Sequence, residues 1–298
     1  MQFILYLIFL FFTGLFSFMP FWLLYRLSDL LFLLLFYVFR YRKKVVIKNL
    51  ENAFPQKNTK EIFYIARGFY HNLCDILLEG IKGFSISKRT IVKRYKILNP
   101  EILLANYNKG ESVIALAGHC SNWEWGAFAG GLQTIHTNIA FYKPLSNRYI
   151  DNFMQRIRAK CKTKLVSIYT TARTFKDYKN TLCVYLMIAD QSPSNVQKAY
   201  WVNFLHQDTA CLHGPEKYAC LYNLPLYFLD IRRVKRGYYE VEILKLIDNP
   251  NDYKEGQITE KYMQILESVI RRSPENWLWS HRRWKKKRIN SPLCTSNQ

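Results

Sequence analysis

The chain has 298 residues, and its 43 Lys and Arg against 22 Asp and Glu give a formal net charge of +21 at pH 7. This length accommodates one sizeable domain with an accessory segment and does not require two full domains. The charge indicates an anionic partner, which composition leaves open among nucleic acid, anionic lipid and an acidic protein. Aromatic residues make up 16% of the chain, so a large apolar core, an apolar substrate or a membrane surface is expected.

The first 25 residues contain no charged side chain. Such a stretch is long enough to cross a bilayer, for which about 20 apolar residues suffice. It has neither the basic start nor the small-residue cleavage site of a secretory signal peptide. The chain becomes amphipathic after Pro20 and apolar again over 30–39. A bent spanning helix followed by an interfacial helix, or a short helical hairpin, would each fit this pattern; the alternative is a buried core helix.

A basic run follows at once, comprising Arg40, Arg42, Lys43, Lys44 and Lys48. Because positive residues flank membrane segments on the cytoplasmic side, this end and the domain after it are predicted to be cytoplasmic. The sequence therefore divides into an N-terminal membrane anchor, residues 1–40, and an α/β domain, residues 41–298.

Helical and strand patterns alternate in the second part. Apolar residues recur at helical spacing over 62–82, 148–160 and 258–272, and short apolar or alternating runs at 112–117, 137–142, 164–169, 181–188, 225–232 and 238–246 predict strands. Strands interleaved with helices indicate an α/β fold with a mixed sheet flanked by helices.

Seven cysteines occur without a C-x-x-C pair. The odd number and the spacing fit neither a disulfide framework nor a zinc site. We expect most of them to be small buried side chains in a reducing compartment. Cys120 stands apart because it neighbours His119.

The segment from Gly118 to Gly126, GHCSNWEWG, lies where a buried strand ends and a helix begins. Ligands commonly bind at such a junction in α/β sheets. His119 could take a proton from a substrate hydroxyl, and the nearby Glu124 could fix its tautomer and stabilise the imidazolium. A His and an acid at this spacing also arise by chance, and Ser121 with Glu124 would satisfy a helix capping box.

Further motifs occur in order along the chain. They are Val45, Asn49-Leu50 and Phe54-Pro55; Glu79; G-H-x-x-N-W-E at 118–124; Tyr142-Lys-Pro144 and Asn147; Arg156; Ala189-Asp190-Gln191; Thr209 and Gly214-Pro215; and the ending 277–285, WLWSHRRWK. With this ordered set the chain resembles the lipid A biosynthesis acyltransferases, the late acyltransferases of the lysophospholipid acyltransferase-like superfamily. The resemblance implies the glycerolipid acyltransferase-like fold.

The resemblance also implies the site. His119 corresponds to the general base and Glu124 to its acidic partner. Arg156 matches the functional arginine, Asp190 an acid near the site, and Asn122 belongs to the same motif as the base; these three are predicted to bind substrate.

The activity implied by the resemblance is transfer of a fatty acyl chain from acyl carrier protein to a hydroxyl of a lipid A precursor, at the bacterial inner membrane. No metal, tightly bound cofactor or nucleic-acid partner is implied. Coenzyme A stays open as the thioester carrier, and a lysophospholipid or an amino-acid-based lipid as the acceptor. A different class, a non-catalytic protein that binds a membrane surface or nucleic acid by its charge, would leave the 118–126 segment without a purpose.

Three positions carry an alternative interpretation. On the predicted 148–160 helix, Arg156 and Arg158 flank an apolar stripe, and we interpret Arg156 as the residue that meets phosphate or thioester oxygen and Arg158 as solvated. Asp190 could instead be a turn residue or a helix cap. His281 lies in a basic ending that would cover a membrane surface or contact an anionic headgroup, with its tryptophans packed on the core or interface.

Overall fold

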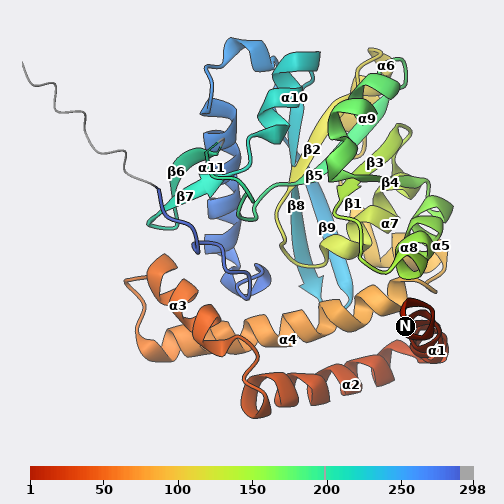
Figure 1. Ribbon diagram of the computed structural model, residues 1–298, viewed down its shortest axis with the longest axis vertical. Coiled ribbons are helices and arrows are strands. Elements are labelled where there is room, and N and C mark those ends of the chain that lie inside the picture. The colour runs from red at the N-terminus through yellow and green to blue at the C-terminus, as the bar shows by residue number, and fades with distance from the viewer. Residues whose placement is uncertain (198, 289–298) are drawn as a thin grey trace, which may run out of the picture.

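A seven-stranded mixed sheet forms the centre of the computed structural model, which describes residues 1–197 and 199–288 (Figure 1). Its strand order is β1-β9-β8-β2-β5-β3-β4. Cys294 lies outside the described residues. The strands are β1 Tyr95–Ile97, β2 Val113–Ala117, β3 Thr137–Tyr142, β4 Thr163–Ser167, β5 Cys183–Ile188, β8 Leu226–Lys235 and β9 Tyr238–Ile247. A separate antiparallel hairpin pairs β6 Tyr200–Phe204 with β7 Gln207–Cys211.

Within the sheet only β8 and β9 run antiparallel, and the other neighbours are parallel. The predicted α/β fold with a mixed sheet is confirmed, and each predicted strand is present within a few residues of its expected ends. The sequence patterns missed β1 and the β6–β7 hairpin. Three residues are too few to show an alternation, and β1 is completed by the Gln133 side chain, which bonds the backbone of Tyr95 and Ile97.

The two faces of the sheet differ in side-chain size because successive residues of a strand point to opposite faces. On β2, Ile114 and Leu116 belong to the main apolar core, whereas Ala115 and Ala117 point to the other face. The main core packs against α4 Thr59–Gly83 and α11 Gln257–Arg272. The face with the alanines is opposite α7 Trp123–Gln133.

The remaining helices complete the layers. They are α1 Gln2–Phe18, α2 Phe21–Leu33, α3 Lys43–Ala53, α5 Lys88–Arg94, α6 Glu101–Asn108, α8 Arg148–Lys160, α9 Thr171–Asp177 and α10 Gly214–Tyr222. Helices α2, α3 and α4 lie below the sheet in Figure 1, near the ends of β8 and β9 that join in a hairpin turn. Helix α4 begins with a capping box in which Asn58 and Glu61 bond each other's backbone N–H groups.

A buried ion-pair network fastens α2 to this layer. Asp75 on α4 is 1% exposed. Its carboxylate accepts hydrogen bonds from Ser28 on α2 (2.6 Å) and from Arg233 (2.6 Å) and Arg236 (2.7 Å) of the β8–β9 hairpin. Arg236 also pairs with Asp29 of α2 at 2.6 Å. A buried carboxylate is tolerable when its charge is paired and its oxygens are bonded, so the hairpin of the sheet and the N-terminal helices are held together.

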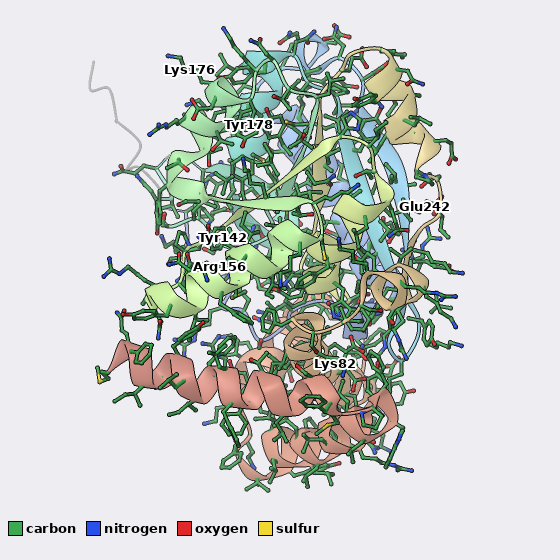
Figure 2. The ribbon with its side chains drawn as sticks, turned by 90° about the vertical axis from the view of Figure 1, so that its right-hand side faces the viewer. Lys82, Tyr142, Arg156, Lys176, Tyr178 and Glu242 are labelled. Carbon is green, nitrogen blue, oxygen red and sulfur yellow. The ribbon has the colours of Figure 1, made fainter. Side chains whose placement is uncertain are left out.

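The N-terminal segment is broken at Pro20, between α1 and α2, and the choice between a bent spanning helix and a helical hairpin stays a prediction. Helix α1 ends at Phe18, and its last carbonyls are bonded by the Lys82 ammonium, which reaches Ser17 O at 2.6 Å and Met19 O at 2.9 Å (Figure 2). Proline lacks the N–H that would continue the helix. One helix among the described residues, 21–38, is long and apolar enough to cross a membrane, and α1 is a shorter apolar helix.

Candidate active site

The register between β2 and β5 brings a histidine and an aspartate together. The strands are parallel, and Ala117 pairs with Ile188. His119 and Asp190 each follow two residues later, so both side chains leave the sheet at the same edge. His119 Nδ1 lies 2.5 Å from Asp190 Oδ1, and the His119 backbone N–H donates to Oδ2 at 2.8 Å. A third donor, the Trp277 indole N–H, reaches Oδ2 at 2.8 Å.

These contacts set the charge of the pair. Burial alone would raise the pKa of Asp190, but the charge of His119 and the hydrogen bonds outweigh it and lower that pKa to about 2. Burial likewise opposes protonation of His119, but the negative charges of Asp190 and Glu124 raise its pKa above 6.5. An ionised Asp190 therefore stabilises the imidazolium form.

The hydrogen-bond network also fixes the tautomer of the neutral ring. Ionised Asp190 can only accept, so Nδ1 of His119 carries the proton and Nε2 carries a lone pair. The side-chain amide of Gln191 lies 3.2 Å from Nε2. The Trp123 ring packs edge-on against the imidazole with 5.1 Å between ring centroids. Thus the Nε2 lone pair is available to a hydroxyl that displaces Gln191.

Glu124 occupies a different place from the one its spacing suggested. Its carboxylate pairs with the Arg158 guanidinium of α8. Within 1–197 and 199–288, no hydrogen bond joins Glu124 to His119, and the carboxylate on Nδ1 is that of Asp190. The capping-box interpretation is wrong, because Asn122 is the N-cap of α7 and Ser121 donates to Ile231 O.

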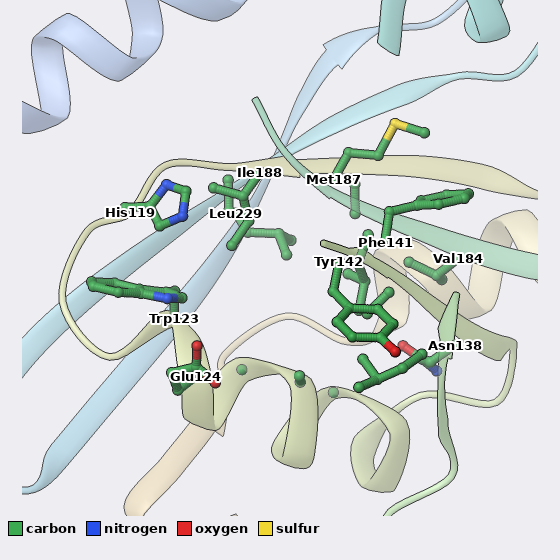
Figure 3. Close-up of a pocket in the computed structure, with 18 of the residues that line it drawn as sticks. His119, Trp123, Glu124, Asn138, Phe141, Tyr142, Val184, Met187, Ile188 and Leu229 are labelled. Atoms are coloured by element: carbon green, nitrogen blue, oxygen red, sulfur yellow. The ribbon is translucent and has the colours of Figure 1, made fainter. Parts of the chain in front are cut away.

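A mostly apolar cavity of about 630 Å³ opens beside the imidazole (Figure 3). It lies between α7 and the face of the sheet that carries the alanines. His119, Trp123, Glu124, Arg158 and Gln191 are part of its lining. A long apolar chain could enter it with a reactive group left beside Nε2. No group of three or more His, Cys, Asp or Glu suited to a metal ion occurs in the part of the chain that the structure describes.

A family model for the bacterial lipid A biosynthesis acyltransferases matches residues 1–286. The chain belongs to this family. The family is membrane-associated in bacteria, and membership implies an acyltransferase rather than a non-catalytic protein driven by charge. No curated protein matches the chain.

In this acyltransferase each of the two arginines of α8 has the environment that was expected for the other. Arg158 is buried at 6% exposure, lines the cavity and pairs with Glu124, so its interpretation as a solvated residue is wrong. Arg156 is exposed on α8 (Figure 2) and is not part of the cavity lining. A contact of Arg156 with substrate stays a prediction, and it would be made outside the cavity.

Asn122, also predicted to bind substrate, is fully buried in the acyltransferase. Its Oδ1 accepts from Trp125 N at 2.9 Å, and its Nδ2 donates to Glu79 Oε2 at 2.6 Å. Glu79 also accepts from Tyr239 (2.7 Å) and from Tyr25 of α2 (2.8 Å). This geometry favours a positioning role, in which Asn122 holds the 118–124 loop onto α4, over direct contact with substrate.

In the basic C-terminal segment, the side chains of His281 and Arg283 are turned toward the interior. His281 Nε2 accepts from Ser192 N at 3.2 Å, and burial lowers its pKa to about 4. A neutral, bonded His281 has no positive charge to offer a headgroup, so that interpretation is wrong for His281. Arg283 is buried as well, at 2% exposure. Trp277 and Trp279 pack in the core, as expected.

The six cysteines within residues 1–197 and 199–288 are free and mostly buried, as predicted. Burial raises the pKa of the Cys120 thiol well above its usual value. A thiol that stays protonated is a poor nucleophile, so Cys120 acts as a small apolar side chain beside His119.

Sequence reasoning missed the places of Gln191 at His119 Nε2, of Trp277 at Asp190 and of Arg158 in the cavity lining. The equal offset of His119 and Asp190 from two predicted strands could have indicated their meeting, had the strands been known to pair. For Trp277, 87 residues beyond Asp190, the spacing carried no such signal.

Replacing Asp190 with Asn is expected to slow acyl transfer by about a hundredfold or more, the usual contribution of a positioned general base. A histidine that serves as a general base is active when neutral, so activity is expected to fall as the pH drops through the raised pKa of His119. The acidic limb of kcat/KM is therefore expected at higher pH than the pKa of a free histidine in the wild type, and at lower pH in the variant, since Asn no longer stabilises the imidazolium. Asp177→Asn, at an exposed pair with Arg173, is the control. An unmoved limb in Asp190→Asn would contradict the pairing.

The two arginines of α8 offer a matched comparison. Arg158→Ala is expected to lower kcat/KM about tenfold or more, because it removes a charge-assisted hydrogen bond in the cavity lining. Arg156→Ala, on the exposed surface of the same helix, is expected to change it less. Both are measured on purified protein whose thermal unfolding has been checked. A larger loss in Arg156→Ala would restore the sequence-based assignment.

Proposed function

We propose that the protein transfers a fatty acyl chain from a thioester of acyl carrier protein to a hydroxyl of a lipid A precursor, with His119 as the general base. The observation that carries this proposal is an imidazole whose Nδ1 is held by buried Asp190 and whose Nε2 lies at an apolar cavity. Family membership gives the lipid class; the carrier, the hydroxyl and the residue roles belong to the proposal.

The acceptor hydroxyl takes the place of the Gln191 amide at Nε2. Its oxygen attacks the thioester carbonyl carbon while its proton passes to Nε2, and Asp190 stabilises the resulting imidazolium. Collapse of the tetrahedral intermediate breaks the C–S bond. The proton on Nε2 then passes to the departing sulfur, which leaves the carrier thiol, the new ester and a neutral His119. No protein nucleophile is needed.

Glu124 supports this cycle through charge and position. Its carboxylate adds to the negative field that raises the pKa of His119, and its pair with Arg158 ties α7 to α8 across the cavity. We assign to Arg158 the role of stabilising negative charge that develops on the thioester oxygen, because a guanidinium held in a dry lining is well suited to it.

The placement of the site fits a substrate in a membrane. Asn122 and Glu79 join the catalytic loop to α4, and Tyr25 joins α4 to α2, within the apolar helix 21–38. The basic run at 40–48 follows that helix, which favours the bacterial inner membrane with the α/β domain on the cytoplasmic side. A charge of +21 suits three anionic partners, namely the bilayer surface, a phosphorylated acceptor and an acidic carrier protein.

The test compares lipid A from a deletion strain complemented with defined variants. The deletion is expected to lose one acyl chain from lipid A, seen by mass spectrometry. Wild type and His206→Ala, a change at an exposed histidine, should restore the chain, whereas His119→Ala should not, although it reaches the membrane in equal amount.

If lipid A is unchanged in the deletion strain and another lipid class is altered, the acceptor of the same reaction is a lysophospholipid or an amino-acid-based lipid. Restoration by His119→Ala would remove the base assignment. Purified protein supplied with carrier-protein and coenzyme A thioesters of one acyl chain decides the donor.

A further inference from the structure

The two apolar helices at the N-terminus lie at the short end of what a membrane crossing needs. Helix α1 has 17 residues, and the apolar helix 21–38 has 18. At 1.5 Å per residue they extend about 26 and about 27 Å, whereas the hydrocarbon core of a bilayer is about 30 Å thick. Helix 21–38 also contains Arg26 and Asp29, and charged side chains deep in hydrocarbon are costly.

Helix 21–38 is packed against the α/β domain from one end to the other. Near its start, Leu24 shares an apolar cluster with Leu78 of α4. Near its end, Phe36 packs edge-on against Phe63 and Tyr70 of α4, with 5.3 and 5.2 Å between ring centroids. The helix therefore cannot enter a membrane without α4.

The centre of helix 21–38 makes polar contacts with α4 and the sheet. Ser28 donates to Asp75 of α4 at 2.6 Å, and Asp29 pairs with Arg236 of the β8–β9 hairpin at 2.6 Å. If this helix crossed a bilayer, its centre and these ions would lie near the midplane, where charges are most costly. The contacts favour a position at the membrane surface over a crossing.

Helix α1 is held to the same domain at its start, middle and end. Asn147 Nδ2, just before α8, donates to Gln2 O at 2.8 Å. Phe9 packs edge-on against Phe153 of α8 with 5.4 Å between ring centroids, and Lys82 of α4 bonds the carbonyls at the end of α1. Because α8 also lines the active-site cavity, a crossing by α1 would draw part of the active site into the bilayer.

The two helices lie flat in one layer beneath the sheet. Helix α2 runs across the bottom of Figure 1, and α1 is seen nearly end-on at its right. In Figure 2, turned by 90° about the vertical axis, α1 runs across the lower part of the molecule. Both helices are therefore crosswise to β8 and β9, which run up and down in Figure 1. Because the two helices also cross one another, they do not form an antiparallel hairpin.

Each helix turns one stripe of side chains toward the domain and an apolar face outward. The inward stripes, with residues three or four apart, are Phe9, Thr13 and Phe16 on α1 and Ser28, Phe32 and Phe36 on 21–38. The outward face is exposed at Phe11, Leu15 and Phe18 on α1 and at Trp22, Leu30 and Leu33 on 21–38. An apolar surface of this extent marks a site that binds a membrane or another protein.

The charges beside this surface indicate what covers it. Directly after helix 21–38 come the exposed cations Arg40, Arg42, Lys44 and Lys48. An apolar layer bordered by cations suits a bilayer, whose acyl chains cover the apolar face and whose anionic headgroups attract the cations. The family is also membrane-associated in bacteria. These observations favour a lipid leaflet over a partner protein.

We propose that α1 and helix 21–38 lie flat within the leaflet on the side of the α/β domain, and that neither crosses the bilayer. A helix with its side chains is about 10 Å across, which fits within one leaflet of about 15 Å, half of the hydrocarbon core. The N-terminus then lies on the same side of the membrane as the α/β domain. This arrangement differs from both the bent spanning helix and the hairpin, and it does not depend on the proposed acyl-transfer reaction.

The first test measures depth along helix 21–38 in full-length protein in vesicles of phosphatidylethanolamine and phosphatidylglycerol. Spin labels are attached singly to Leu23→Cys, Leu30→Cys and Leu34→Cys, at positions exposed on one face. Collisions with oxygen and with a water-soluble nickel complex report each depth by electron paramagnetic resonance. The flat helix should give one depth, whereas a crossing helix would spread the labels over about 16 Å, because positions 23 and 34 are about three turns apart.

Lys176→Cys on α9 is the matched control, since it is exposed at the other end of the molecule from the two helices (Figure 2); its label should report water. Protein without an introduced cysteine gives the background from the native thiols. Equal depths at 23, 30 and 34 support the proposal whether or not the preparation transfers an acyl chain. A depth that changes steadily from 23 to 34 overturns it.

The second test locates the N-terminus in cells. Epitope tags are placed before Met1 or at the C-terminus, and spheroplasts are treated with protease before and after lysis. Both tags should be protected in intact spheroplasts and digested after lysis. Digestion of the N-terminal tag alone in intact spheroplasts would show a single crossing and overturn the proposal, even if His119 acts as proposed.

Discussion

The buried carboxylate of Asp190 is the group on which the site depends. At 2% exposure it would be costly to ionise without partners, and it has three donors, from the His119 backbone, the His119 ring and Trp277. Each donor fixes a different part of the structure. The backbone N–H of His119 fixes the loop after β2, the ring N–H fixes the imidazole tautomer, and Trp277 fixes the C-terminal segment against the sheet. The charge that satisfies these donors is also the charge that makes His119 a stronger base.

A second constraint holds the 118–124 loop against α4. Glu79 collects hydrogen bonds from Asn122 in the loop, from Tyr239 in the sheet and from Tyr25 in the apolar N-terminal helix. Trp125 completes the contact by donating its indole N–H to the Glu79 carbonyl at 2.8 Å. The edge of the sheet that carries His119 and Asp190 is consequently fixed to the apolar helix 21–38, which among the described residues is long enough to cross a membrane.

Much of the fold was predictable because its signals are local. Strand β3 and helix α8 have the expected bounds, since apolar runs and helical spacing report burial directly. His119 was found from its place after a strand, and Asp190 from a family motif. Its pairing with His119 depends on which strands are neighbours, and that is decided by long-range packing. The prediction assigned the environments of Arg156 and Arg158 the wrong way round for a similar reason. Both arginines flank the apolar stripe of α8, and which of them is buried depends on what packs against that helix, here Glu124 of α7.

The most direct test of the account is a ¹⁵N NMR titration of the histidine side chains in the full-length protein, with His119 assigned through His119→Gln among the six histidines. It requires no substrate and reads the tautomer and the pKa at once. We expect a neutral ring protonated on Nδ1, a pKa raised above that of a free histidine and a fall of that pKa in Asp190→Asn. A proton on Nε2 of the neutral ring, or a pKa that Asp190→Asn leaves unchanged, would contradict it.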